Sequence, residues 1–354
     1  MALGLRALEI FARMSDRARI IEKFLEGQGY GAARRTPLAG DASFRRYERL
    51  FIEGGEGEES IVLMDAPPPM EDVRPFVAVA ERLNRFGFSA PEIIAADTEN
   101  GLLLIEDFGD QTYTEILKTD PGKEHDLYAL AVDFLIALHR QPVEKTAAGF
   151  PSYDVDRLQD EHAQFINWYY PEIIAAEIPS SGRKAYLDLW RQLLDGLPPL
   201  PQVLVLRDFH VDNLMLLPGR DGISACGLLD FQDAVAGSCV YDLVSLLGDA
   251  RRDVPVDIVG QMKARYLDAF PELDRQAFEA AYAVFSAQRN CKILGIFVRL
   301  CVRDRKCGYF EHIPRLWRLL EESLRHPVLA PLDAWMAEYF PAEYRAPPDC
   351  RFPS

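Results

Sequence analysis

The hydrophobic periodicity of the chain changes near Gly109. Before this point, short apolar runs alternate with polar turns, and only residues 15–29 and 73–86 have the spacing of amphipathic helices. After it, helical spacing recurs over residues 127–139, 162–170, 184–194, 256–270, 276–302 and 315–324. The change predicts an α+β fold with a small β-rich lobe over residues 1–108 and a larger helical lobe over residues 109–354.

Strands are predicted in the first lobe over residues 45–52, 60–64, 92–96 and 102–105. The polar sequence EGGEGEE lies between the first two and is typical of a hairpin turn. Because ligands usually bind where lobes meet, we expect a cleft near residues 105–112.

One stretch of the second lobe interrupts the helical pattern. From Val203 to Phe231 the chain reads VLVL, RDFHVDN and LMLL, then a PGRDG turn and ISACGLLDF. This order predicts a local hairpin of short strands, with Asp208, Asn213 and Asp230 at one end of it.

These three side chains suit phosphoryl transfer from a nucleotide. An Asp can accept the proton of an attacking hydroxyl, while an Asn and a second Asp offer Mg²⁺ the hard oxygen ligands that it prefers. An Asp and an Asn five residues apart also arise by chance, and both residue types cap turns. The strand–loop–strand order around them favours the site.

Charge and cysteine spacing exclude several classes of function. The chain has 55 acidic and 39 basic side chains and a formal charge of −16, so nucleic acid and anionic membranes are poor partners. The six cysteines, at positions 226, 239, 291, 301, 307 and 350, have no zinc spacing, and we expect free thiols in a reducing cytoplasm. The N-terminus is no signal peptide, residues 1–14 are a candidate extension, and Met14 is a second candidate start.

Two further segments are weaker candidates for nucleotide contacts. Residues 37–47 form a loop of small residues that enters a strand, and such a loop can fold over phosphates. Residues 104–109, LIEDFG, end a strand whose backbone can pair with an adenine edge. An ordinary hairpin turn and an ordinary strand end explain the two segments equally well.

Taken together, these segments resemble the aminoglycoside phosphotransferase and choline kinase group, relatives of the protein kinases. The resemblance covers residues 15–325 and is carried by GDASFRRY (40–47), IVLMDAPP (61–68), LLIEDFGD (103–110), RDFHVDNLM (207–215), LLDFQDA (228–234) and YDLVSLLGDARRDV (241–254). The combination of GDASFRRY, MDAPP and DFQDA is similar to that of bacterial kinases acting on the anomeric hydroxyl of N-acetylated amino sugars.

The resemblance implies a protein-kinase-like two-lobe fold, ATP and Mg²⁺ as cofactors, and a role for each matching residue. Asp208 would be the catalytic base, Arg207 would orient its loop by pairing with a carboxylate, and Asn213 and Asp230 would hold Mg²⁺. The remaining positions are Gly40, Asp41, Ala42, Ser43 and Phe44 over the phosphates, the backbone of Glu106 and Phe108 at adenine, Glu81 as the helix glutamate, Asp233 as a further acidic position and Asp242 as a brace of the catalytic loop.

The chain departs from the family at one position. The strand lysine that would contact the phosphates and pair with Glu81 should fall near Leu63 to Asp65, where there is none. Arg45 and Arg46 point to opposite sides of their strand, so one of them can face the nucleotide, and we include Arg46 among the nucleotide-binding candidates. A solvent-exposed arginine is the alternative for each.

Sugar sites combine aromatic faces with charged and amide groups. The candidates are Trp168, Arg299, Arg303 and Tyr309, with Asp233, although core packing and a solvated helix face also explain them. We therefore expect a cytoplasmic, monomeric kinase that transfers phosphate from ATP to an amino sugar in peptidoglycan recycling. There are two alternatives. The acceptor can be another small alcohol, such as an aminoglycoside or choline, or the protein can be a non-catalytic nucleotide-binding module.

Overall fold

A computed structural model describes residues 16–38, 44–52 and 59–348. Contacts group the chain into two compact units, Met1–Ile116 with Leu214–Asp233, and Leu117–Asn213 with Ala234–Ser354. The grouping differs from the predicted boundary after residue 108, because a later segment belongs with the first unit. The candidate extension 1–14 and the loop residues 40–43 lie outside the described residues.

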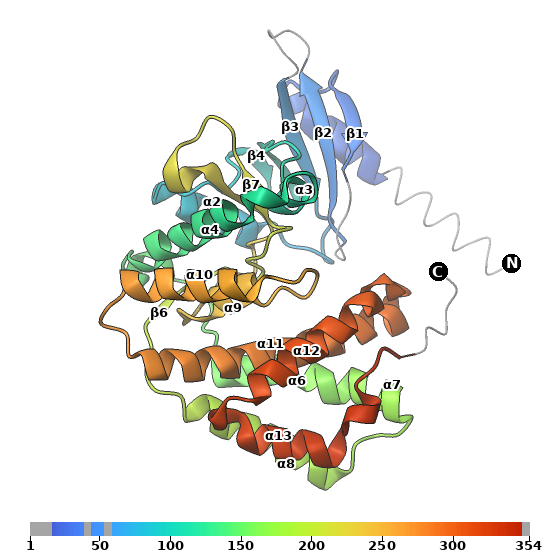
Figure 1. Ribbon diagram of the computed structural model, residues 1–354. Helices are drawn as coiled ribbons and strands as arrows, with labels where there is room; N and C mark the ends of the chain where they lie inside the picture. The colour runs from blue at the N-terminus through green and yellow to red at the C-terminus, as the bar shows by residue number, and fades with distance from the viewer. Residues whose placement is uncertain (1–15, 39–43, 53–58, 349–354) are drawn as a thin grey trace, which may run out of the picture. The chain divides into compact units, whose positions relative to one another are not determined.

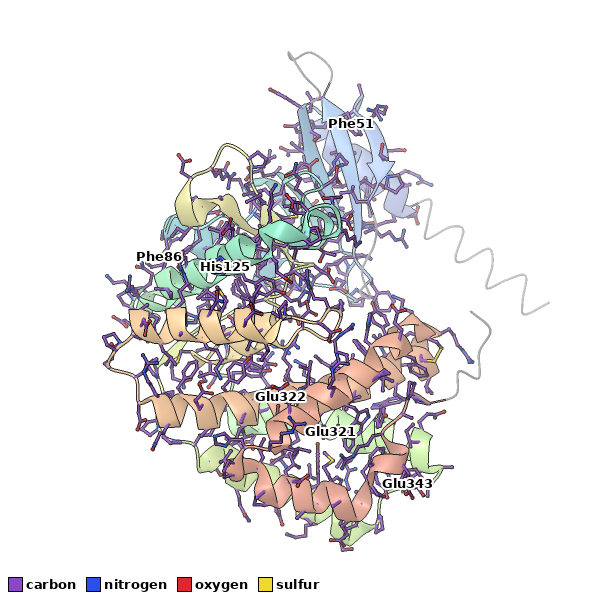
Figure 2. The ribbon with its side chains drawn as sticks, viewed as in Figure 1. Phe51, Phe86, His125, Glu321, Glu322 and Glu343 are labelled. Carbon is purple, nitrogen blue, oxygen red and sulfur yellow. A yellow bond between two sulfur atoms is a disulfide. The ribbon has the colours of Figure 1, made fainter. Side chains whose placement is uncertain are left out.

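The first unit is built on a five-stranded antiparallel sheet (Figure 1). Its strands are β1 (Arg34–Pro37), β2 (Arg46–Ile52), β3 (Glu59–Asp65), β4 (Ile93–Asp97) and β5 (Leu102–Glu106), in the order β1-β2-β3-β5-β4. A helix over residues 16–27 packs Ile21 and Leu25 against apolar strand residues that include Leu63. On β1, the Arg34 guanidinium lies 3.8 Å from the ring centre of Phe51. Phe51, on β2, is labelled in Figure 2.

The later segment of this unit is a hairpin of β7 (Leu214–Leu216) and β8 (Cys226–Leu228), joined by η3 (Gly222–Ala225). The Leu228 N–H donates to the Ser89 carbonyl at 2.9 Å, and Met215 forms a bridge with Thr112. The hairpin is therefore bonded to the region around α2 (Arg74–Arg85) and α3 (Tyr113–Thr119).

The predicted local hairpin is partly wrong. The strand before the loop that contains Asp208, β6 (Gln202–Val205), does not pair with β7 but with β9 (Val235–Ser238), which was not predicted. Short apolar strands offer several equivalent partners, and the sequence contains no local signal for a pairing over this distance.

The second unit is mainly helical. Its helices are α4 (Glu124–His139), α5 (Val143–Thr146), α6 (Val155–Gln164), α7 (Tyr170–Ile174), α8 (Ser180–Asp195), α9 (Tyr241–Leu247), α10 (Val256–Ala269), α11 (Arg275–Asp304), α12 (Ile313–Leu324) and α13 (Ala330–Tyr339). A π-helical segment, η2 (Phe165–Tyr169), continues α6, and short 3₁₀ turns lie at η1 (Pro121–Lys123), η4 (Cys307–His312), η5 (Pro327–Leu329) and η6 (Ala342–Tyr344). The six predicted helical segments are confirmed, with shifted ends. No helix in the described part of the chain is long and apolar enough to cross a membrane.

Helix α11 organises this unit, since it packs against α6, α9 and α12 (Figure 1). Asp274 caps its start by accepting the Gln276 N–H at 2.8 Å. One face of α11 meets α6 through polar side chains, with Gln288 donating to the Leu158 carbonyl at 3.2 Å. Further along α11, Gly295 allows α11 and α6 to approach each other very closely.

Replacing Gly295 by alanine is expected to destabilise the protein by about 1–3 kcal/mol, because the new methyl overpacks the α6–α11 contact. A Cβ there would lie 2.2 Å from the carbonyl carbon of Gln164, which is backbone and cannot move aside cheaply. Guanidinium unfolding measures the change. Gly260→Ala on α10 is the control, since nothing lies within 4 Å of its added Cβ. Equal unfolding midpoints for Gly295→Ala and wild type would contradict this packing.

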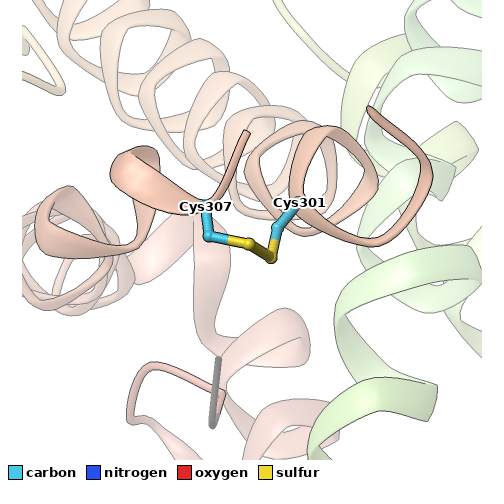
Figure 3. Close-up of a disulfide and its surroundings, with 2 residues drawn as sticks. All are labelled: Cys301 and Cys307. Atoms are coloured by element: carbon cyan, nitrogen blue, oxygen red, sulfur yellow. A yellow bond between two sulfur atoms is a disulfide. The ribbon is translucent and has the colours of Figure 1, made fainter. Parts of the chain in front are cut away.

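Two cysteines that were predicted to be free thiols form a disulfide (Figure 3). Cys301 at the end of α11 is bonded to Cys307 at the start of η4, with 4.2 Å between their Cα atoms. Arg305 adopts a left-handed conformation, φ 62°, which turns the chain back and brings the two cysteines together. Cys226, Cys239 and Cys291 are free and buried, as the low polarity of their surroundings favours. Cys350 lies outside the described residues.

Candidate active site

The loop between β6 and β7 holds Asp208 in a tight turn. The Asp208 N–H donates to the Leu206 carbonyl at 2.9 Å, and the intervening Arg207 has a φ of 71°. The Asn213 side-chain amide donates to the Asp208 carbonyl at 2.9 Å, so the two ends of the loop are linked. Left-handed non-glycine residues are rare and gather at functional sites, which supports a functional role for this turn.

Arg207 pairs with a carboxylate, as predicted, and that carboxylate is Glu161 on α6. Glu161 also receives a salt bridge from Lys292 at 3.0 Å and a hydrogen bond from the Tyr153 hydroxyl at 2.5 Å. Burial alone would raise the pKa of Glu161, but Lys292 and Arg207 outweigh it and lower that pKa. Glu161 is therefore an ionised anchor that holds the Arg207 side chain.

Asp242 braces the same turn through the backbone, also as predicted. Its two carboxylate oxygens accept the N–H groups of Leu206 at 2.7 Å and Arg207 at 2.9 Å. Burial raises the pKa of Asp242 to about 7, against the effect of these two hydrogen bonds. Asp208 thus follows Arg207, whose backbone is held by Asp242 and whose side chain is held by Glu161.

A network that was not predicted surrounds the second half of the loop. Burial, with Arg251 and Arg289 nearby, holds the pKa of His210 well below its usual value, so its ring is neutral. The His210 Nε2 atom lies 3.2 Å from Arg251 Nη1 and 3.4 Å from the Asn213 side-chain nitrogen, which makes Nε2 the acceptor. Arg251 also lies 3.4 Å, from Nε to Oδ2, from Asp212. These partners are far from the loop in sequence, and no local pattern marks them.

The two residues expected to hold Mg²⁺ offer suitable oxygens. The Asn213 amide nitrogen is engaged by the Asp208 carbonyl, which turns the amide oxygen away from it. In the first unit, Asp230 has a φ of 55°, and its Oδ1 accepts a hydrogen bond from Gln232 at 2.7 Å. A neutral amide and a carboxylate match the hard oxygen ligands that Mg²⁺ prefers.

Arg45, rather than Arg46, lies beside Asp230. Its Nη1 is 4.0 Å from Asp230 Oδ1, and its side chain is 11% exposed, whereas Arg46 is exposed. The partner of Arg45 is Glu71, which accepts its Nε–H at 3.1 Å and the Phe44 N–H at 3.1 Å. Glu71 was not predicted as a site residue, because a glutamate after three prolines is no recognised signal.

The predicted helix glutamate lies elsewhere. Glu81 is exposed on α2 and lines a shallow hollow with Asn84, Arg85, Glu92 and Ile93. Phe44, at the end of the predicted phosphate loop, is 60% exposed. The carboxylate that pairs with the Arg45 guanidinium, next to Asp230, is therefore that of Glu71 and not that of Glu81.

The segment expected at adenine is held by an arginine that was not predicted. Arg220 pairs with Glu106 and lies with its guanidinium 5.3 Å from the ring centre of Phe108. Burial raises the pKa of Glu106, although Arg220 opposes this shift. The Glu106 N–H donates to the Glu92 carbonyl at 2.9 Å, so this residue can offer adenine only its own carbonyl.

The predicted sugar-binding residues are scattered over several elements. Arg303 is exposed and pairs with its neighbour Asp304, while Arg299 donates to Gln164 at 3.2 Å. Tyr309 stacks on Phe297 at 4.9 Å between ring centres. Half-buried Trp168 lies in the π-helical segment, and exposed Asp233 ends the first unit. Their roles at a sugar stay predictions.

Comparisons with known proteins agree with the geometry of the loop. Residues 34–279 match the phosphotransferase enzyme family. The chain is 37% identical to an N-acetylmuramate/N-acetylglucosamine kinase of Caulobacter vibrioides, over 94% of this chain and 99% of the relative.

Solved structures of the same fold include choline kinase LicA from Streptococcus pneumoniae, with a TM-score of 0.60, 11% identity and coverage of 87% of this chain and 99% of that one. A thermostable mutant of an aminoglycoside phosphotransferase is similar with a TM-score of 0.58, 12% identity and coverage of 86% and 99%. The expected kinase-like fold is thus confirmed. The chain belongs to the phosphotransferase enzyme family.

Proposed function

We propose that the protein transfers the γ-phosphoryl group of ATP to the C1 hydroxyl of N-acetylmuramate or N-acetylglucosamine. The observation that carries the proposal is the braced loop around Asp208, with Asn213 bonded to it at 2.9 Å. The named kinase to which the chain is 37% identical over nearly its whole length supports this choice of acceptor. The product would be a sugar 1-phosphate, and peptidoglycan recycling is the process in which such a sugar arises.

Asp208 accepts the proton of the attacking hydroxyl, and Arg207 keeps that carboxylate in place through Glu161 and Asp242. Asn213 and Asp230 would hold Mg²⁺, which would supply positive charge to stabilise the transferring phosphoryl group. The carbonyl of Glu106 and the N–H of Phe108 receive the adenine edge. Transfer is direct and in line, so no protein nucleophile is needed.

Arg45 supplies the cation that the family places on a strand lysine. Its guanidinium is next to Asp230 and is oriented by Glu71, so a phosphate oxygen there would gain a charge-assisted hydrogen bond. Arg45→Met is expected to raise the KM for ATP about 10- to 100-fold, as the loss of one such bond predicts. Steady-state kinetics with varied ATP measure it.

Arg46→Met is the matched comparison on the same strand, and a change below about threefold is expected for it. Arg45→Lys should recover part of the ATP affinity, because it keeps the charge and loses only the fork geometry. A larger effect from Arg46→Met than from Arg45→Met would assign the phosphate contact to Arg46 instead.

The acceptor is tested by incubating the protein with ATP, Mg²⁺ and one compound from a panel of N-acetylmuramate, N-acetylglucosamine, choline and kanamycin. ADP release is followed, and the product is examined by phosphorus NMR. We expect sugar-dependent ADP release and a phosphate coupled to the anomeric proton. Turnover only with choline or kanamycin would reject the sugar and keep the phosphotransferase. Bound ATP without turnover on any compound would reject the proposed reaction.

A further inference from the structure

The two proposed sugars differ in one charged group, and their recognition therefore needs a cation. N-acetylmuramate carries a lactyl carboxylate that N-acetylglucosamine lacks, and a carboxylate taken out of water needs a charged partner. Arg299 and Arg303 were the predicted partners. Neither contacts the catalytic loop among the described residues, since Arg299 bonds Gln164 and Arg303 pairs with Asp304.

Two other arginines are tied to the catalytic loop, and they differ in access. The Arg207 side chain is 13% exposed and pairs with Glu161. The Arg251 side chain is 34% exposed, and its partner Asp212, four residues after Asp208, is 35% exposed. Arg251 is therefore the loop-bound cation that a solute can reach more easily.

The contacts of the Arg251 side chain are loose. Its 3.4 Å distance to Asp212 is longer than the 2.7–2.9 Å that is typical of a charge-assisted hydrogen bond. Its second contact is with His210, a neutral ring, at 3.2 Å. A carboxylate of the acceptor can thus compete with Asp212 for this guanidinium.

The backbone that carries Arg251 is held firmly by its neighbours. The Arg251 N–H donates to Asp249 Oδ1 at 2.8 Å, and Arg315 donates to the Ala250 carbonyl at 3.1 Å. Arg252 pairs with Glu124 on α4. A fixed backbone lowers the entropy cost of binding a ligand at this residue, because only the side chain then has to be ordered.

We propose that Arg251 binds the lactyl carboxylate of N-acetylmuramate and makes the enzyme prefer the acidic sugar to a neutral one. The inference rests on the proposed function and adds to it the residue that distinguishes the two sugars. Arg251 then binds the carboxylate of the acceptor, while Asp208 accepts the proton of the hydroxyl that is phosphorylated.

The test uses three acceptors: N-acetylmuramate, its methyl ester at the lactyl carboxylate, and N-acetylglucosamine. Wild type is expected to have a kcat/KM at least about 10-fold higher for the acid than for the ester. Arg251→Gln should lower kcat/KM for the acid about 10- to 100-fold and change the two neutral acceptors less than about threefold. Arg251→Lys should show a smaller loss, restricted to the acid.

Arg252→Gln is the matched control, because it removes the adjacent guanidinium, and it should leave the acid-to-ester ratio unchanged. An equal loss on all three acceptors would show that Arg251 only positions the loop through His210 and Asp212, and would overturn the inference. A wild type without preference for the acid would also overturn it, while the proposed function would stand. No phosphorylation of any acceptor would reject both.

Discussion

Replacing Asp208 by asparagine is expected to lower kcat about 1,000-fold or more, since an amide at this position cannot accept the hydroxyl proton. The change is nearly isosteric. The Asn213 amide bonds the Asp208 backbone carbonyl and not its side chain, so the loop should keep its conformation. Turnover of the acceptor sugar is measured at saturating ATP and sugar.

Nucleotide binding separates a chemical effect from a folding defect. The affinity of Asp208→Asn for ATP, measured by calorimetry, should stay within about threefold of wild type. Asp156→Asn on α6 is the control, because this exposed aspartate pairs with Arg191 at the surface. Turnover of Asp208→Asn close to that of the control would remove Asp208 from the mechanism.

The second large effect is a change in the free energy of unfolding at acidic pH, which two buried histidines cause. Burial lowers the pKa of both His139 and His162 to about 3, whereas an unfolded histidine titrates near 6.5. The His139 ring is bonded to the Tyr266 hydroxyl at 2.7 Å, and the His162 ring is stacked on Trp190 at 4.6 Å. Both residues are therefore neutral in the folded protein.

Stability should consequently fall as the pH falls from about 6.5 towards 3. Above pH 6.5, neither the folded nor the unfolded protein binds protons at these rings. Below pH 6.5, the unfolded protein binds protons at the two histidines, whereas the folded protein does not. The contribution of these two rings alone falls by about 2 kcal/mol for each histidine, or about 4 kcal/mol for both, between pH 7 and pH 5. Guanidinium unfolding at the two pH values measures it.

Variants isolate the histidine contribution from that of the carboxylates. His162→Gln should change the difference in stability between pH 7 and pH 5 by about 2 kcal/mol relative to wild type, because one titrating group is lost. His125→Gln is the control, since this side chain is 53% exposed on α4 (Figure 2). The same pH dependence in wild type and His162→Gln would contradict the buried, neutral state of His162.

Local patterns in the sequence predicted much of this molecule. Helical spacing located the long helices, and the spacing of Asp208, Asn213 and Asp230 drew attention to the loop between β6 and β7 and to the end of β8, whose roles in catalysis and Mg²⁺ binding stay predictions. Each of these signals lies within one element or one loop, where periodicity and motif spacing are direct physical consequences of the backbone.

Partners distant in sequence were not predictable in this way. Arg207 needed a carboxylate, but only the fold shows that Glu161, 46 residues earlier, supplies it. Strand alternation required Arg45 and Arg46 to face opposite ways, yet it could not tell which one lies beside Asp230. The pairing of β6 with β9 was not predicted for the same reason, because contacts between distant segments depend on packing and not on local pattern.

The hairpin of β7 and β8 also has a consequence for anyone who wishes to produce the first unit alone. A fragment that stops at Ile116 would lack Phe231, which stacks on Phe76 at 4.8 Å, and the strand that bonds Ser89. Thr112 and Met215 are bridged, so the cut ends of this unit are neighbours. A short glycine-rich linker from residue 116 to residue 214 would therefore reconnect the missing piece, whereas simple truncation would leave an exposed apolar surface prone to aggregation.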